Sequence, residues 1–207
     1  MMEQHATRAV LAAPGQSSPQ EPNHLTGVAE ELLFRRQRGR STVIVLTSVR
    51  PAAGVTYVTG LVAAEIARLK GLDSLVITLE EAMRLPDQPE ESEEDTFLET
   101  TPHVWVAAQD ALQPEPVAPG AIAKRIRELQ NWPGTFVLLD CPPLNQDLPA
   151  DILSMADGVV LVVAAGETRQ ADLAQAAAGL DETGAPIIGM ILNKRSYAIP
   201  KSIFRYV

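Results

Sequence analysis

The chain has 207 residues, of which 46% are hydrophobic and only 4% aromatic, and its net charge is -9. This length suffices for one domain of ordinary size, with a core of Val, Ile, Leu and Ala. The negative charge argues against an extended nucleic-acid surface, which needs clustered Lys and Arg. A local basic spot remains at Arg35, Arg36, Arg38 and Arg40.

The single cysteine, Cys141, excludes an internal disulfide and fits a reducing cytosol. The three histidines are scattered and share no ligand spacing, so no zinc site is expected. No apolar run approaches the roughly 18 residues of a membrane span. We therefore expect a cytoplasmic protein that reaches a membrane only through a partner.

Residues 1–25 are rich in Pro, Gly and Ser and predict a flexible segment, followed by a single domain over 26–207. The stretch from Val28 to Gln37 predicts a short amphipathic helix, either a packing helix or a docking element. The acidic stretch from Glu80 to Asp95 predicts an exposed loop, and Gln113 to Gly120 a Pro-rich connection.

Apolar runs and helical periodicities alternate along the rest of the chain. Strands are expected from Thr42 and over 74–79, 103–107, 135–140, 158–163 and 187–192, and helices over 56–70, 121–131 and 169–182. Such alternation favours an α/β fold with a mostly parallel sheet and helices on both faces. Ligands of these sheets bind beyond the carboxyl ends of the strands.

The stretch between the first strand and the helix after it has the shape of a phosphate-binding loop. Such a loop ends in Gly-Lys-Ser/Thr, whose Lys neutralises the β- and γ-phosphates. Here Gly54 and Thr56 match, but Val55 stands at the Lys position, and Ala52 and Ala53 replace residues of greater backbone freedom. Taken alone, the stretch could equally be an ordinary strand-to-helix turn.

Four segments carry a resemblance to a known family: Leu46–Pro51, Phe136–Pro143, Ala156–Val163 and Gly184–Asn193. In order and spacing they resemble the cytoplasmic domain of bacterial tyrosine kinases, the autokinases of polysaccharide synthesis within the MinD and ParA group of P-loop ATPases. The resemblance runs from about Val28 to the C-terminus. It implies a P-loop NTPase-like, three-layer α/β fold.

The resemblance also implies site residues. ATP or ADP would contact the loop residues Pro51, Ala52, Ala53, Gly54, Val55, Thr56 and Tyr57. It would also contact Asn193, which matches a residue that contacts adenine in relatives. Thr56 and Asp140 would hold Mg²⁺. Thr78 and Glu80 stand where the family has two Asp, so with Asp140 they form a vestigial catalytic set. The tyrosine cluster of the family's tail is reduced to Tyr197 and Tyr206.

Three functions are compatible with these residues. The first is a degenerate, non-catalytic kinase-like domain that partners an inner-membrane polysaccharide copolymerase or a competent related kinase in exopolysaccharide or capsule assembly, and that can form homo-oligomers. The second is an active tyrosine autokinase in which another cation, with Arg50 the nearest, replaces the Lys. The third is a MinD- or ParA-like ATPase. Arg50 can also be a solvated loop charge, and Cys141 is expected to be a packed residue rather than a nucleophile.

Overall fold

The computed structural model describes residues 25–86, 96–113, 122–146 and 148–194. Its seven strands form one sheet in the order β3-β4-β2-β5-β1-β6-β7. Their bounds are β1 Thr42–Ser48, β2 Ser74–Thr78, β3 Phe97–Thr101, β4 Val104–Ala107, β5 Phe136–Asp140, β6 Gly158–Ala164 and β7 Ile187–Asn193. All neighbouring pairs are parallel except β3 with β4. The predicted α/β class and mostly parallel sheet are confirmed.

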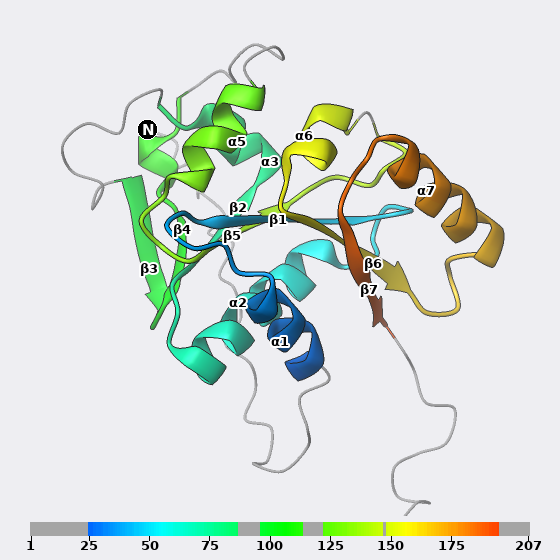
Figure 1. Cartoon of the computed structure of the whole chain (residues 1–207), viewed down its shortest axis with the longest axis horizontal. Coiled ribbons are helices and arrows are strands. Elements are labelled where there is room, and N and C mark those ends of the chain that lie inside the picture. Colours follow the sequence, from blue (N-terminus) through cyan, green and yellow to red (C-terminus); the bar gives the residue numbers. More distant parts are fainter. Residues whose placement is uncertain (1–24, 87–95, 114–121, 147, 195–207) are drawn as a thin grey trace, which may run out of the picture.

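Helices cover both faces of the sheet (Figure 1). One layer holds α1 (Thr26–Phe34) and α2 (Val55–Lys70). The other holds α3 (Leu79–Arg84), α5 (Ile122–Gln130), α6 (Ala150–Met155) and α7 (Gln170–Glu182), and a short 3-10 helix, η1 (Gln109–Ala111), follows β4. No helix among the residues described here has both the length and the apolar character needed to cross a bilayer.

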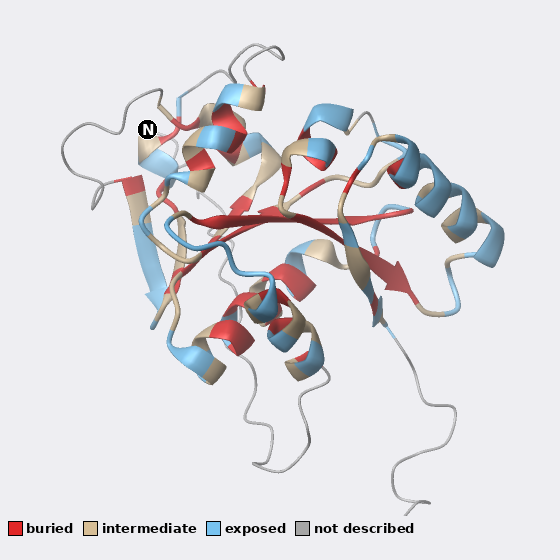
Figure 2. Cartoon of the chain, viewed as in Figure 1, coloured by how far each residue is buried: buried red, intermediate tan, exposed pale blue. Residues whose placement is uncertain are grey.

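The core lies on both sides of the central strands. Every residue of β1 and β6 is buried, as Figure 2 shows along the middle of the sheet. Successive side chains of β1 pack against opposite helix layers. Val43 and Val45 pack with the layer of α3, α5, α6 and α7, whereas Ile44 and Leu46 pack with α1 and α2. A continuous β-branched run without polar alternation is therefore the expected sequence of such a strand.

The structure differs from the sequence analysis at three elements. The predicted loop from Glu80 is wrong at its start, because α3 begins at Leu79 and is capped by Thr78. Strand β3 was not expected; it pairs antiparallel with β4 and has exposed residues, so it lacks the apolar run that revealed the other strands. Helix α6 was also missed, since its six residues are too few to establish a helical period.

Other expectations fall on residues outside the described ranges. These are the flexible segment up to residue 24, the acidic stretch over 87–95, most of the Pro-rich connection, and Tyr197 and Tyr206. Within the described part, the helix after β1 ends at Gly71 as predicted, with a left-handed φ of 57° that favours glycine.

Candidate functional site

The candidate site lies at the carboxyl edge of β1, β2 and β5. In register, Leu46 of β1 and Thr78 of β2 both pair with Asp140, the last residue of β5. Asp140 thus sits between the two strands, and the loop after β1 leads past it into α2. The Thr56 hydroxyl in the first turn of α2 donates a hydrogen bond of 2.5 Å to Asp140 Oδ2. The two residues expected to hold Mg²⁺ are therefore in direct contact.

Asp140 is not held as a free, solvated carboxylate. Burial raises its pKa above the usual range, the hydrogen bond from Thr56 opposes that effect, and the nearby charge of Glu81 adds to the increase. No lysine or arginine of the described residues is among the main influences on this pKa. The described part of the chain therefore places no positive charge beside the carboxylate that is expected to hold Mg²⁺.

The backbone of the loop keeps the shape of an anion cradle. Gly54 has a φ of 87°, which suits glycine, and α2 begins directly after it at Val55 without a side-chain cap. The first N–H groups of this 16-residue helix are thus available to an anion. Ala52, however, also has a positive φ of 61°, a conformation that costs an alanine roughly 1–2 kcal/mol.

No described cation takes over the role of the missing lysine. The Arg50 guanidinium points to α7, where its Nε lies 3.7 Å from Asp172 Oδ2. Both side chains line a cleft of about 530 Å³ between the start of the loop, α6 and α7, and Val55 and Thr56 are not part of its lining. Lys194, just after β7, forms an ion pair of 3.2 Å with Glu167.

Asn193 is brought to the loop as expected, but it holds the loop itself. Its side-chain amide donates a hydrogen bond of 2.8 Å to the carbonyl of Ala53. The same amide nitrogen would lie 2.4 Å from a Cβ at position 54, so a side chain there would displace the Asn193 amide. The side chain that the resemblance assigns to adenine is here engaged with the backbone of the loop.

Thr78 has a structural role, and Glu80 is a surface residue. The Thr78 hydroxyl accepts a hydrogen bond of 3.1 Å from the Glu81 N–H, and the Glu81 carboxylate accepts one of 2.9 Å from the Thr78 N–H. This reciprocal capping box starts α3. Glu80 is exposed and lies 3.6 Å from Arg84 one turn later. The acid that influences Asp140 is therefore Glu81, which the sequence analysis missed although Thr-x-x-Glu is a capping signal.

The remaining predicted residues lie around this centre. Pro51 and Tyr57 are exposed, and Tyr57 keeps 63% of its surface accessible. Cys141 is buried in the core, and this burial, together with the charge of Asp140, raises the pKa of its thiol. A protonated, inaccessible thiol is not a nucleophile, so the expectation of a packed cysteine is supported.

Together these groups fit part of a nucleotide–magnesium complex. Backbone N–H groups could hold a phosphate, and Thr56 with Asp140 could hold Mg²⁺ by a hydroxyl and a carboxylate. The described residues contain no group of three or more His, Cys, Asp or Glu able to hold a metal ion. Mg²⁺ would therefore depend on phosphate oxygens and water, while the charge that neutralises a γ-phosphate is absent from Val55.

Known proteins resemble this chain at two levels. Over 67 residues it is 31% identical to the tyrosine-protein kinase CpsD of Streptococcus pneumoniae, which is 32% of this chain and 30% of that kinase. The kinase domain of Escherichia coli tyrosine kinase ETK has a TM-score of 0.58 at 15% identity, over 89% of this chain and 86% of that domain. MinD from Pyrococcus horikoshii, in complex with Mg-ADP, has a TM-score of 0.53 at 18% identity, over 79% and 75%.

No protein-family model matches the chain. The sequence match covers less than a third of the curated kinase, whereas the structural matches cover most of both chains. The fold expected from the four sequence segments is thus confirmed: the chain has the P-loop fold shared by bacterial tyrosine-kinase domains and MinD-type ATPases.

Proposed function

We propose that this chain is a non-catalytic, kinase-like binding domain that acts as a cytoplasmic partner in exopolysaccharide or capsule assembly. The observation that carries the proposal is the charge balance at the loop. Val55 occupies the lysine position, and Arg50 and Lys194, the cations that the described residues place near the loop, are paired with Asp172 and Glu167. A phosphoryl transfer site without a cation at the γ-phosphate loses its main means of stabilising the transition state.

Two hydrogen bonds also hold the loop in its present conformation. The hydrogen bond from Asn193 to Ala53 and the one from Thr56 to Asp140 hold both sides of it. Binding of ATP or ADP with Mg²⁺ would have to replace these contacts, so we expect it to be weak or absent. The surface of the domain, rather than turnover at this edge, would then be the functional part.

The pathway and partners rest on similarity to the kinases. We infer that the domain contacts an inner-membrane polysaccharide copolymerase or a competent related kinase, and that it can self-associate. This inference draws on the match to the pneumococcal kinase and on the shared fold. On this inference the chain would act in the cytoplasm beside the membrane.

Calorimetry on the purified full chain tests the site. We expect no heat from ADP and Mg²⁺ with the wild type and recovered binding with Val55→Lys, because one charged contact is worth about 1.5–3 kcal/mol, or about 10- to 150-fold in Kd. Val55→Met is the matched control, with similar bulk and no charge. Tight binding by the wild type would refute the proposal.

A second candidate, a nucleotide-dependent ATPase, is favoured by one observation. Thr56 and Asp140, the two residues that the resemblance assigns to Mg²⁺, are in contact. If the wild type bound nucleotide, hydrolysis that disappears in Asp140→Asn would support this candidate. Binding without hydrolysis would instead indicate that nucleotide has a structural role only.

A further inference from the structure

A second charged feature lies at the opposite end of β1, in the loop that joins α1 to this strand. Between Glu31 and Glu65 the sequence contains no acid, and four arginines fall within residues 35–40. These charges stand out in a chain whose net charge is -9. We define the basic loop as residues 34–40; it contains Phe34, Arg35, Arg36, Arg38 and Arg40.

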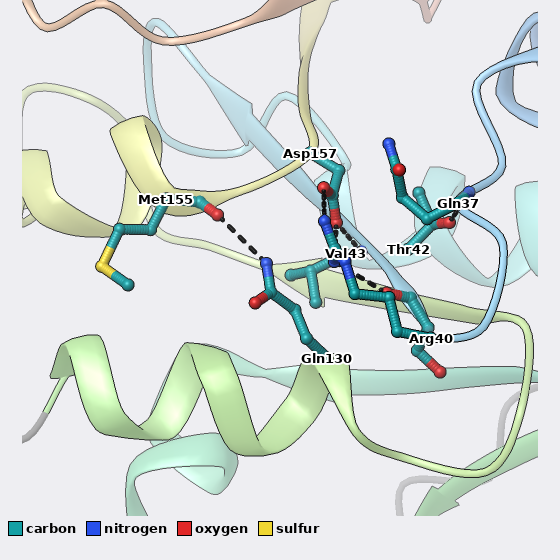
Figure 3. A network of polar contacts seen from close by, with 8 residues as sticks. Gln37, Arg40, Thr42, Val43, Gln130, Met155 and Asp157 are labelled. Atoms are coloured by element: carbon teal, nitrogen blue, oxygen red, sulfur yellow. Dashed lines mark hydrogen bonds and ion pairs between the residues drawn. The ribbon is translucent and has the colours of Figure 1, made fainter.

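The base of this loop is fixed to the sheet (Figure 3). Arg40 donates hydrogen bonds of 2.9 and 2.5 Å to the two carboxylate oxygens of Asp157, which also accepts one of 2.9 Å from the Val43 N–H. The Gln37 N–H donates to the Thr42 hydroxyl at 2.8 Å. Arg40 is therefore a structural residue, and it anchors the loop to the start of β1.

The outer part of the basic loop has no such engagement. Arg35 pairs with Glu31 at 2.6 Å, but the side chains of Arg36 and Arg38 are exposed and form no hydrogen bond or ion pair with any described residue. They line a hollow of about 440 Å³, whose other wall is formed by residues 131–135 and includes Trp132. The hollow can thus receive an anionic group between two guanidinium groups that no described residue engages.

An exposed aromatic side chain stands directly beside these charges. Phe34, the last residue of α1, keeps 87% of its surface accessible, more than any other large hydrophobic side chain in the described part of the chain. Exposed aromatic rings next to arginines suit the boundary between lipid headgroups and acyl chains. An acidic polypeptide would also satisfy the arginines, but the exposed phenyl ring beside them additionally suits the apolar layer of a membrane.

We propose that the basic loop binds directly to anionic phospholipid membranes, with Arg36 and Arg38 at headgroup phosphates and Phe34 inserted beneath them. This departs from the expectation that the chain reaches a membrane only through a partner. The phosphate-loop edge lies at the other end of the seven-residue strand β1, about 20 Å away. Membrane contact would therefore leave that edge accessible.

Co-sedimentation of the full chain with vesicles tests this proposal. Vesicles of phosphatidylcholine with 30% phosphatidylglycerol should bind the protein in 0.1 M salt, and binding should fall sharply in 0.5 M salt because screening shortens the reach of the charges. Pure phosphatidylcholine should bind little. Arg36→Gln with Arg38→Gln should lower the partition coefficient about 25-fold, at about 5-fold per charge, and Phe34→Ala about 10-fold.

Matched variants remove equal charge or apolar surface elsewhere. Arg127→Gln with Arg169→Gln alters two exposed arginines of the other helix layer, and Leu98→Ala alters an exposed side chain of β3; all should bind as the wild type does. Equal losses in the control and test variants would overturn the proposal. So would absence of vesicle binding, including the case in which the chain binds a soluble polyglutamate peptide through the same arginines.

Discussion

Replacement of Asp157 by Ala should strongly destabilise the fold, although this residue lies far from the candidate site. Its side chain is only 9% exposed and accepts two hydrogen bonds from Arg40 and one from the Val43 N–H. Loss of the charged bonds costs about 1.5–3 kcal/mol, and an unsatisfied strand N–H about 1–3 kcal/mol more. Arg40 is 34% exposed, so water recovers part of this loss.

We therefore expect Asp157→Ala to lower the free energy of unfolding by about 3 kcal/mol, which corresponds to a fall in Tm of about 6–12 °C for a domain of this size. Asp157→Asn should lose roughly half as much, because its amide oxygen can still accept from Val43. Urea unfolding followed by circular dichroism measures both variants, with exposed Asp181→Ala as the control. A loss below 1 kcal/mol for Asp157→Ala would refute this reasoning, as would equal losses for Ala and Asn.

Two further predictions concern the candidate site. Thr78→Ala should cost about 1 kcal/mol through the lost cap of α3, whereas Glu80→Ala should be nearly neutral in urea unfolding; the reverse order would contradict the capping assignment. Because the pKa of Asp140 is raised in the folded state, the native protein binds this proton more tightly than the unfolded chain, and stability should fall as pH rises from 3.8 through the folded pKa. Asp140→Asn should hence be more stable than the wild type at neutral pH, with the difference vanishing below pH 3.8 in pH-dependent unfolding.

The central part of the fold could be predicted from the sequence because its signals are local. The buried run from Thr42 and the Gly71 stop after α2 each follow from residues close together in the chain. Strand β3 gives no such signal, since it is an edge strand with exposed residues that depends on pairing with β4. Helix α3 did carry one, the Thr78 and Glu81 capping pair, but the acids that follow it indicated a loop.

The candidate site was predictable in position but not in its contacts. The register of parallel strands brings Asp140 to the loop, as the sequence suggested, because carboxyl ends share one edge of the sheet. The pairing of Arg50 with Asp172 joins residues far apart in the chain, and no local pattern predicts it. The same is true of Asn193, whose bond to Ala53 depends on where β7 ends.

The contact between Thr56 and Asp140 bears on how degenerate sites of this kind should be interpreted. Both residues are expected in a working nucleotide site, yet here their hydrogen bond also joins the start of α2 to the end of β5. Their presence alone therefore does not indicate that a nucleotide binds. The charge of the residue at position 55 distinguishes a nucleotide-binding site from a degenerate one better, because a valine there forms no polar contact that could replace the ammonium group at a phosphate. The Val55→Lys variant restores that charge and leaves the contact between Thr56 and Asp140 intact. If this variant binds nucleotide, the site lacks only the ammonium group; if it does not, the shape of the site is no longer suitable.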